Sequence, residues 1–293
     1  MSGPVTRRDF MKGTIGVAIA GGTAFGGLQA PSGKTTRVVL VRNDRVWLAG
    51  GALDPAVVQG MLDEAVMKLT GEGDVRAAFR HFVKSDDVVG VKSNVWRMLP
   101  TPRELENAIL ARVRQAGVPA ERIGVDDRGV LGNPLFRNAT AIINVRPMRT
   151  HYWSGVGGCL KNMITFTPRP SDYHGDSCAD MASFWKLPLV AGKVKLNILS
   201  MLNPLFHGRG PHHFDQRYVW RYNGLLVGTD PVAVDAVGLA IIQAKRRSFF
   251  GDERALQTPP KHIELADRRH GLGIADLRRI ELIRLGSSTD ILI

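Results

Sequence analysis

The sequence is poor in cysteine, with only Cys159 and Cys178 among its 293 residues. Two thiolates cannot supply the four ligands of an iron–sulfur cluster, so no self-contained cluster is expected. The two thiols could form a disulfide in an oxidising compartment, and the sequence leaves this pairing open.

Long apolar runs and long basic runs are also missing. The weakly apolar stretch at 13–27 is too short and too rich in glycine for a membrane span. Lysine and arginine outnumber aspartate and glutamate by 39 to 27, but they are scattered in short pairs such as Arg246-Arg247. No nucleic-acid motif accompanies them, so we expect no nucleic acid as a partner. The net charge of +12 favours anionic partners: a small anionic ligand, a polyanion or an anionic surface.

The N-terminus has the pattern of an export signal. The segment TRRDFMK (6–12) precedes the apolar run, and Leu28-Gln29-Ala30 forms a small-residue exit. The paired arginines resemble a twin-arginine signal, which is an address and not an anchor. We therefore predict a signal peptide over 1–30 and a linker over 31–36. The expected partner is the twin-arginine translocation machinery, the expected location is periplasmic or otherwise exported, and no stable membrane span is expected after cleavage.

Strand and helix patterns alternate along the rest of the chain. Apolar runs predict strands at 37–43, 86–94, 122–127, 140–146, 195–202, 222–230 and 280–286. Helical periodicity predicts helices at 55–71, 75–83, 101–117 and 231–247, with Thr101 as the N-cap of the third. This alternation is typical of an α/β fold with a largely parallel sheet flanked by helices. We expect one domain over 37–293 with a long irregular middle segment (151–195 and 203–221).

Polar side chains follow the predicted strands directly. In open parallel sheets, ligands bind beyond the carboxyl ends of the strands. Lys92 could clamp a carboxylate or phosphate there, or mark where the strand meets water. Asp126 and Asp127 could ligate a hard cation or pair with Arg128. The full set at these ends is Lys92, Asn94, Asp126, Asp127, Arg149, His151, Ser200 and Asp230.

Five of the eight histidines fall between 151 and 213. A neutral imidazole is a transition-metal ligand and also a general base near neutral pH. The segment HGRGPHH contains His207, His212 and His213, but its spacing fits no standard zinc motif. A divalent transition-metal site, catalytic or anion contacts without metal, and a structural role all stay open for these three. We expect His262 and His270 to be structural or solvated.

A glycine-rich stretch, HYWSGVGGCLKN (151–162), ends in Lys161 and Asn162. Glycines permit a close approach of the backbone to a ligand and expose N–H donors. If a helix begins near 158, Lys161 lies in its first turns and the loop amides point at an anion. The spacing is not that of a P-loop.

The order of VVGVKSN (88–94), the TH…LKN block (150–162), His174 and GTDPVAVDAV (228–237) resembles the domain-of-unknown-function 362 family. The resemblance spans roughly residues 37–286. It implicates Lys92, Asn94, His151, Lys161, Asn162, His174 and Asp230 with Asp235. Some members are fused to ferredoxin-like domains, which implies a redox partner protein.

Two departures from the family pattern bear on chemistry. Arg149 stands where a lysine is usual, and a guanidinium holds an anion but does not easily act as a base. An aspartate is usual in the block that here reads Asn197-Ile198-Leu199-Ser200. A mechanism that needs a carboxylate in that block is therefore doubtful.

These observations predict one ligand site with separate roles. His151, Lys161 and His174 are the predicted catalytic groups, and the predicted ligand-binding residues are Lys92, Asn94, Arg149, Asn162 and Asp230. The expected function is a metal- or cofactor-dependent exported enzyme acting on a small anionic molecule. The alternative is a non-catalytic protein that binds or delivers a ligand or cofactor for a redox system.

Overall fold

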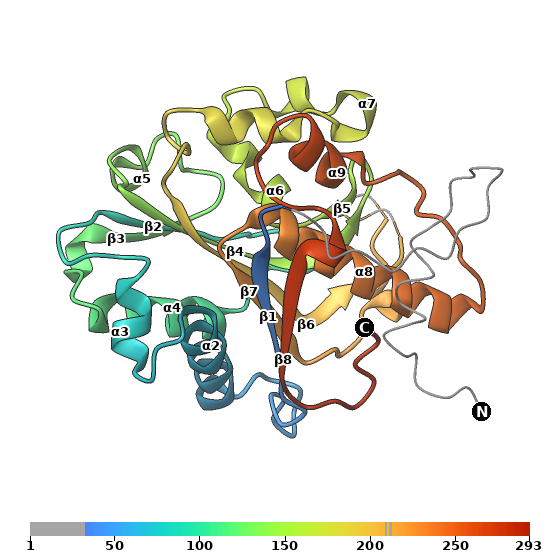
Figure 1. Ribbon diagram of the computed structural model, residues 1–293, viewed down its shortest axis with the longest axis horizontal. Helices are drawn as coiled ribbons and strands as arrows, with labels where there is room; N and C mark the ends of the chain where they lie inside the picture. The colour runs from blue at the N-terminus through green and yellow to red at the C-terminus, as the bar shows by residue number, and fades with distance from the viewer. Residues whose placement is uncertain (1–32, 209, 211–212) are drawn as a thin grey trace.

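The computed structural model describes residues 33–208, 210 and 213–293 (Figure 1). The predicted signal peptide, residues 31–32 of the linker and His212 lie outside the described residues. The described strands form one eight-stranded sheet in the order β3-β2-β4-β6-β7-β1-β8, with β5 paired to β4. They are β1 (Thr36–Arg42), β2 (Val89–Lys92), β3 (Ile123–Asp126), β4 (Ala141–His151), β5 (Gly155–Gly157), β6 (Val194–Leu205), β7 (Gly224–Gly228) and β8 (Ile280–Gly286).

The sheet is largely parallel, as predicted. Strands β3, β2, β4 and β6 are parallel neighbours, and β1 is parallel to β8. Strand β7 runs antiparallel to both β6 and β1, and the short β5 runs antiparallel to β4. The reversal of β7 matters for the site, because its carboxyl end lies at the opposite edge from those of its neighbours.

Helices cover both faces of the sheet (Figure 1). One face carries α2 (Pro55–Thr70), α3 (Val75–Arg80) and α4 (Arg103–Gln115), and its core includes Leu62, Ile109 and Val145. The other core includes Met148, Leu199 and Ile241, under α5 (Pro134–Arg137), α6 (Cys159–Asn162), α7 (Gly175–Cys178), α8 (Pro231–Phe250) and α9 (Lys261–Arg268). Within the described part of the chain, no helix has the length and apolar character to cross a membrane.

The middle segment consists of short helical turns that pack on the second core. Besides α6 and α7, it contains η2 (Met163–Phe166), η3 (Pro170–Tyr173) and η4 (Met181–Lys186). Phe166 and Phe184 are buried there. The remaining 3-10 turns are η1 (Ala120–Arg122), η5 (Gln216–Tyr218) and η6 (Leu277–Arg279). Strands β4 and β6 run beyond their predicted ends, so part of the expected irregular region is sheet.

The predicted cap of α4 is wrong. The helix begins at Arg103, Pro102 occupies the N-cap position, and no side chain caps it. The Thr101 hydroxyl instead accepts the N–H of Asn94 at 3.1 Å and donates to the Val145 carbonyl at 3.5 Å. Thr101 therefore joins the loop after β2 to β4, which are the elements that carry the site.

Candidate functional site

Strand β4 supplies the centre of the site. All eleven of its residues are buried, including Asn144, Arg146, Arg149 and His151. Side chains alternate between faces along a regular strand. The pairing of β4 with β6 breaks between Pro147 and Arg149. Arg146 and Arg149 lie on either side of this break, and the charge of Arg146 lowers the pKa of Arg149 further than burial alone.

Lys92, at the end of β2, is fully buried and forms an internal ion pair. Its Nζ lies 2.5 Å from Asp127 Oδ1 and donates to the Ser93 carbonyl at 2.8 Å. The second carboxylate oxygen of Asp127 accepts the N–H of Val95 at 2.9 Å. Burial lowers the pKa of Lys92 to about 8 despite the attraction of Asp127. Lys92 thus does not mark a strand end in water, and Asp127 pairs with Lys92 and not with Arg128.

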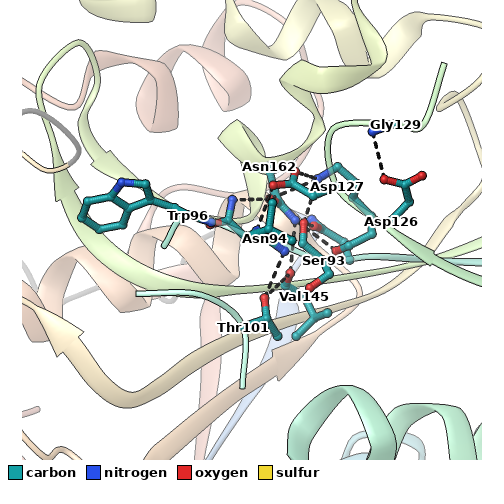
Figure 2. Close-up of polar contacts among 12 residues, drawn as sticks. Ser93, Asn94, Trp96, Thr101, Asp126, Asp127, Gly129, Val145 and Asn162 are labelled. Carbon is teal, nitrogen blue, oxygen red and sulfur yellow. Dashed lines mark hydrogen bonds and ion pairs between the residues drawn. The ribbon is translucent and has the colours of Figure 1, made fainter. Parts of the chain in front are cut away.

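Asn162 and Asn94 lie beside this ion pair (Figure 2), and their hydrogen bonds link Lys92 to Arg149. Asn162 Nδ2 donates to Asn144 Oδ1 at 2.8 Å, and its Oδ1 accepts from Asn94 Nδ2 at 3.3 Å. Asn94 Oδ1 in turn accepts from Arg149 Nη1 at 3.1 Å. The Arg149 guanidinium lies 4.6 Å from the centre of the Trp96 ring. Both predicted asparagines therefore position other groups of the site.

Helix α6, which carries Lys161 and Asn162, is held by Asp235 of α8. The Asp235 carboxylate accepts the N–H groups of Cys159 at 2.6 Å and Leu160 at 2.9 Å. Burial raises the pKa of Asp235 to about 7. A Cβ on Gly158 would lie 2.2 Å from an Asp235 oxygen, so this contact requires glycine.

The Lys161 ammonium is buried without a carboxylate partner. Among the described residues its Nζ forms no salt bridge, and it donates to the Cys178 sulfur at 3.7 Å. Burial lowers the pKa of Lys161 to about 8, and the charges of Arg146 and Arg149 lower it in the same direction. Cys178 is a free, buried thiol, as is Cys159. The disulfide that the sequence left open is not formed in this structure.

The predicted catalytic histidines lie on either side of Trp153. His151 Nδ1 accepts a hydrogen bond from the backbone N–H of Trp153 at 3.2 Å, so its neutral ring carries the proton on Nε2. Burial and the charge of Lys161 hold the pKa of His151 well below its usual value. The His174 ring stacks on Trp153 at 4.3 Å, and burial lowers its pKa to about 4. Both imidazoles are therefore neutral at pH 7.

An open pocket of about 360 Å³ lies outside these groups, lined by Tyr152, Trp153, His174, Ser177, Gln257 and Thr258. Its wall includes a strained segment. Asp176, Ser177 and Cys178 have φ values of 43°, 59° and 63°, a left-handed conformation that costs non-glycine residues energy. Cys178, which follows the pocket residue Ser177, contacts both Lys161 Nζ and the Trp153 carbonyl.

Two residues of the site were not identified from the sequence. Arg146 is 2% exposed, and its Nε and Nη2 have no hydrogen-bond partner among the described residues. A Cβ on Gly157 would lie 2.8 Å from Arg146 Nη2 and 3.4 Å from the His151 ring, so both groups meet over this glycine. His262 of α9 is fully buried, and neither ring nitrogen has a partner in the described chain.

Of these two residues, Arg146 could have been found from the sequence. Arg146 interrupts the apolar run of β4, and an arginine inside a buried strand needs a partner. No such signal marks His262, which stands in a charged helical segment and was expected to be structural or solvated. Burial, together with the charges of Lys161 and Arg146, lowers the pKa of His262 to about 3.

Asp230 has a different position from the one predicted. Because β7 is antiparallel, Asp230 follows it at the far edge of the sheet and caps α8. Its carboxylate accepts from the N–H groups of Val232 and Ala233, and also from that of Ile274 at 2.9 Å. These bonds give Asp230 a structural role as the cap of α8, and its ligand contact stays a prediction.

The histidines predicted as metal ligands are only partly described. His207 Nδ1 accepts from Arg246 Nη1 at 2.8 Å, and its ring packs against Tyr218 and Phe250. His213 is exposed, and His212 lies outside the described residues. No group of three or more histidine, cysteine, aspartate or glutamate side chains within the described ranges could hold a metal ion. The metal site stays a prediction that depends on His212.

The polar cluster therefore comprises β2, β4, α6, α8 and α9 residues around Arg146. Residues 121–240 match the DUF362 family model. The model is described as a domain of unknown function. The DUF362 match covers Arg146, Lys161 and Asp235, but not Lys92, Asn94 or His262. Neither the curated proteins nor the solved structures contain a match.

Proposed function

We propose that this protein is an exported enzyme that binds a small anionic molecule at Arg146 and acts on it. The observation that carries the proposal is the unpartnered edge of the Arg146 guanidinium, buried beside Arg149, Lys161 and His151.

The geometry of that edge supports an oxyanion as the ligand. Nε–H and one Nη2–H point in the same direction, which matches the two oxygens of a carboxylate or a phosphate. A buried charge without partners is costly, and paired hydrogen bonds to an oxyanion would offset much of that cost. The free Nε of Arg149 adds a further donor.

The neighbouring groups support proton transfer. With a pKa of about 8, roughly one-tenth of Lys161 is a neutral amine at pH 7, and this form can accept a proton. His151 in its Nε2–H form can donate a hydrogen bond to the oxyanion that develops when the proton moves. We assign Lys161 as the group that accepts the proton and His151 as the hydrogen-bond donor, with His174 contacting the outer part of the substrate.

A second candidate function is non-catalytic binding or delivery of the anion. The interlocked bonds of Lys92, Asn94 and Asn162 favour it, because a rigid preformed site holds a ligand tightly. A ligand recovered chemically unchanged from the native protein, with no turnover, would favour this function over catalysis.

Export and cofactor dependence are parts of the same proposal. The paired Arg7-Arg8 supports export through the twin-arginine pathway, and HGRGPHH supports a transition metal. The ferredoxin-like domains fused to some members of the family that this chain resembles support a redox partner. Metal analysis and mass spectrometry of protein purified from its exported compartment test the bound cofactor and the native ligand together.

The anion site is tested by thermal unfolding with phosphate, sulfate, acetate and citrate at constant ionic strength. We expect a saturable rise in melting temperature with at least one anion. Arg146→Gln removes it, whereas Arg217→Gln, an exposed matched control, keeps it. The absence of a shift with every anion in a folded protein would refute the proposal.

A further inference from the structure

The buried charges around Arg146 do not balance. The cluster contains four buried cations and two buried carboxylates, namely Lys92, Arg146, Arg149, Lys161, Asp127 and Asp235. With both carboxylates ionised the excess is two positive charges, and protonation of Asp235 below its pKa of about 7 raises it to three.

The two carboxylates are already engaged. Asp127 is the counter-ion of Lys92. Both oxygens of Asp235 accept backbone N–H groups of α6, and the described chain shows no salt bridge between Asp235 and Arg146. Arg146, Arg149 and Lys161 consequently have no ion-pair partner within the described residues.

The histidines do not change this balance. Burial, and after it the charge of Lys161, lowers the pKa values of His151, His174 and His262 and keeps the rings neutral. The net charge of the site is therefore set by the arginines, lysines and aspartates. Burying a net charge without a counter-ion is unfavourable, so the site is complementary to a ligand of opposite charge.

We propose that the ligand of this site carries two negative charges on oxygen atoms, as a phosphate monoester or a dicarboxylate does. One oxyanion group binds the Nε–Nη2 edge of Arg146, and the second charge is balanced by Arg149 and Lys161. The inference rests on the proposed anion site and adds the charge of its ligand.

The experiment compares anions of the same shape and different charge. Sulfate and methanesulfonate present similar tetrahedral oxygens, but only sulfate is a dianion. From melting-temperature titrations of the purified protein at constant ionic strength, we expect sulfate to bind about tenfold tighter or more. Equal affinity for the two would overturn the inference but leave the anion site intact. No shift with either anion, or with the dicarboxylate and phosphate below, would refute both.

Two further pairs distinguish the sources of the second charge. Malonate against acetate tests two carboxylates. Phosphate at pH 6 and pH 8, each measured against sulfate, tests a phosphate group, because only phosphate changes charge over that range. Tighter binding of malonate than of acetate identifies a dicarboxylate site. A ratio of phosphate affinity to sulfate affinity that rises with pH identifies a phosphate site. If neither dianion bound more tightly than the corresponding monoanion, the inference would be contradicted.

Variants locate the second charge. Arg149→Gln and Lys161→Met each remove one positive charge. We therefore expect the ratio of sulfate affinity to methanesulfonate affinity to fall toward one, while methanesulfonate still binds. Arg217→Gln, on the surface, leaves the preference unchanged. If both single variants retained the full preference, the assignment to Arg149 and Lys161 would be wrong. The wild-type comparison decides the ligand charge even if a variant fails to fold.

Discussion

At the scale of single residues, Lys92 and Lys161 show how one side chain type takes two roles. Both are buried, and burial lowers the pKa of each to about 8. Lys92 has Asp127 as a counter-ion, whereas the only described hydrogen-bond partner of Lys161 is a thiol. The first lysine stabilises the fold, and the second is available to a ligand.

Replacing each lysine with methionine should therefore change stability in opposite directions. Lys161→Met removes an uncompensated buried charge and should raise the free energy of unfolding at pH 7 by about 1–3 kcal/mol while weakening the preference for dianions. Lys92→Met leaves Asp127 buried and unpaired and should lower it by about 3–5 kcal/mol. Urea unfolding of the two variants measures both effects.

The pH dependence of the free energy of unfolding provides the control for the two lysine variants. The pKa of Lys161 is lower in the folded protein than in the unfolded chain. Burying the protonated lysine therefore lowers the free energy of unfolding, and the whole of this penalty is present below pH 8. This penalty is lost as the pH rises from 8 toward 10.5, so Lys161 adds a rising term to wild-type stability there. Because other groups also titrate, the test is the difference between wild type and Lys161→Met. A difference that does not shrink from pH 8 to pH 10 would contradict the charge assignment.

At the scale of elements, α6 is fixed from outside. It is a single turn with no capping side chain of its own, and its first N–H groups are satisfied by Asp235 of α8. The two motifs that resemble the family, LKN and GTDPVAVDAV, thus contact each other directly through Asp235.

Two aspartates of the second motif should differ in their effects. Asp230→Ala removes the cap of α8 and should lower the free energy of unfolding by about 1–2 kcal/mol with anion affinity unchanged. Asp235→Ala frees α6, so stability and affinity should both fall. Denaturant unfolding and anion titration of the same samples measure this contrast. A reduced anion affinity in folded Asp230→Ala would show that Asp230 contributes to ligand binding.

The elements were predictable from the sequence to a large extent. Periodicity and apolar runs identify α2, α8 and the long strands, because these patterns reflect burial directly. The direction of β7 was not predictable, since the sequence of a five-residue buried strand does not indicate its direction, and for that reason the sequence did not show that Asp230 lies at the opposite edge of the sheet. His262 was missed because its burial results from the packing of α9 on a distant part of the chain.

At the scale of the whole molecule, the first and last strands of the described chain pair with each other at one side of the sheet. Strand β1 lies between β7 and β8, and β2 lies between β3 and β4 (Figure 1). The segment that matches the DUF362 model, 121–240, contains neither β1, β2 nor β8. Its remaining strands therefore lack neighbours on which their pairing depends.

We expect residues 121–240 expressed alone to be unfolded, and the full chain to unfold in one cooperative transition. Circular dichroism of both, with the fragment also examined by amide proton dispersion in NMR, measures this. A fragment with dispersed signals and a cooperative transition would show that the matched segment folds independently.

The wall formed by Asp176, Ser177 and Cys178 has a kinetic consequence. Cys178 contacts the buried Lys161, and its neighbour Ser177 lines the open pocket. A ligand that passes from one to the other does so when the wall opens, and the strained backbone lowers the cost of opening. The observed association rate should therefore level off at high ligand concentration, at the rate of opening, and not keep rising with diffusional encounter.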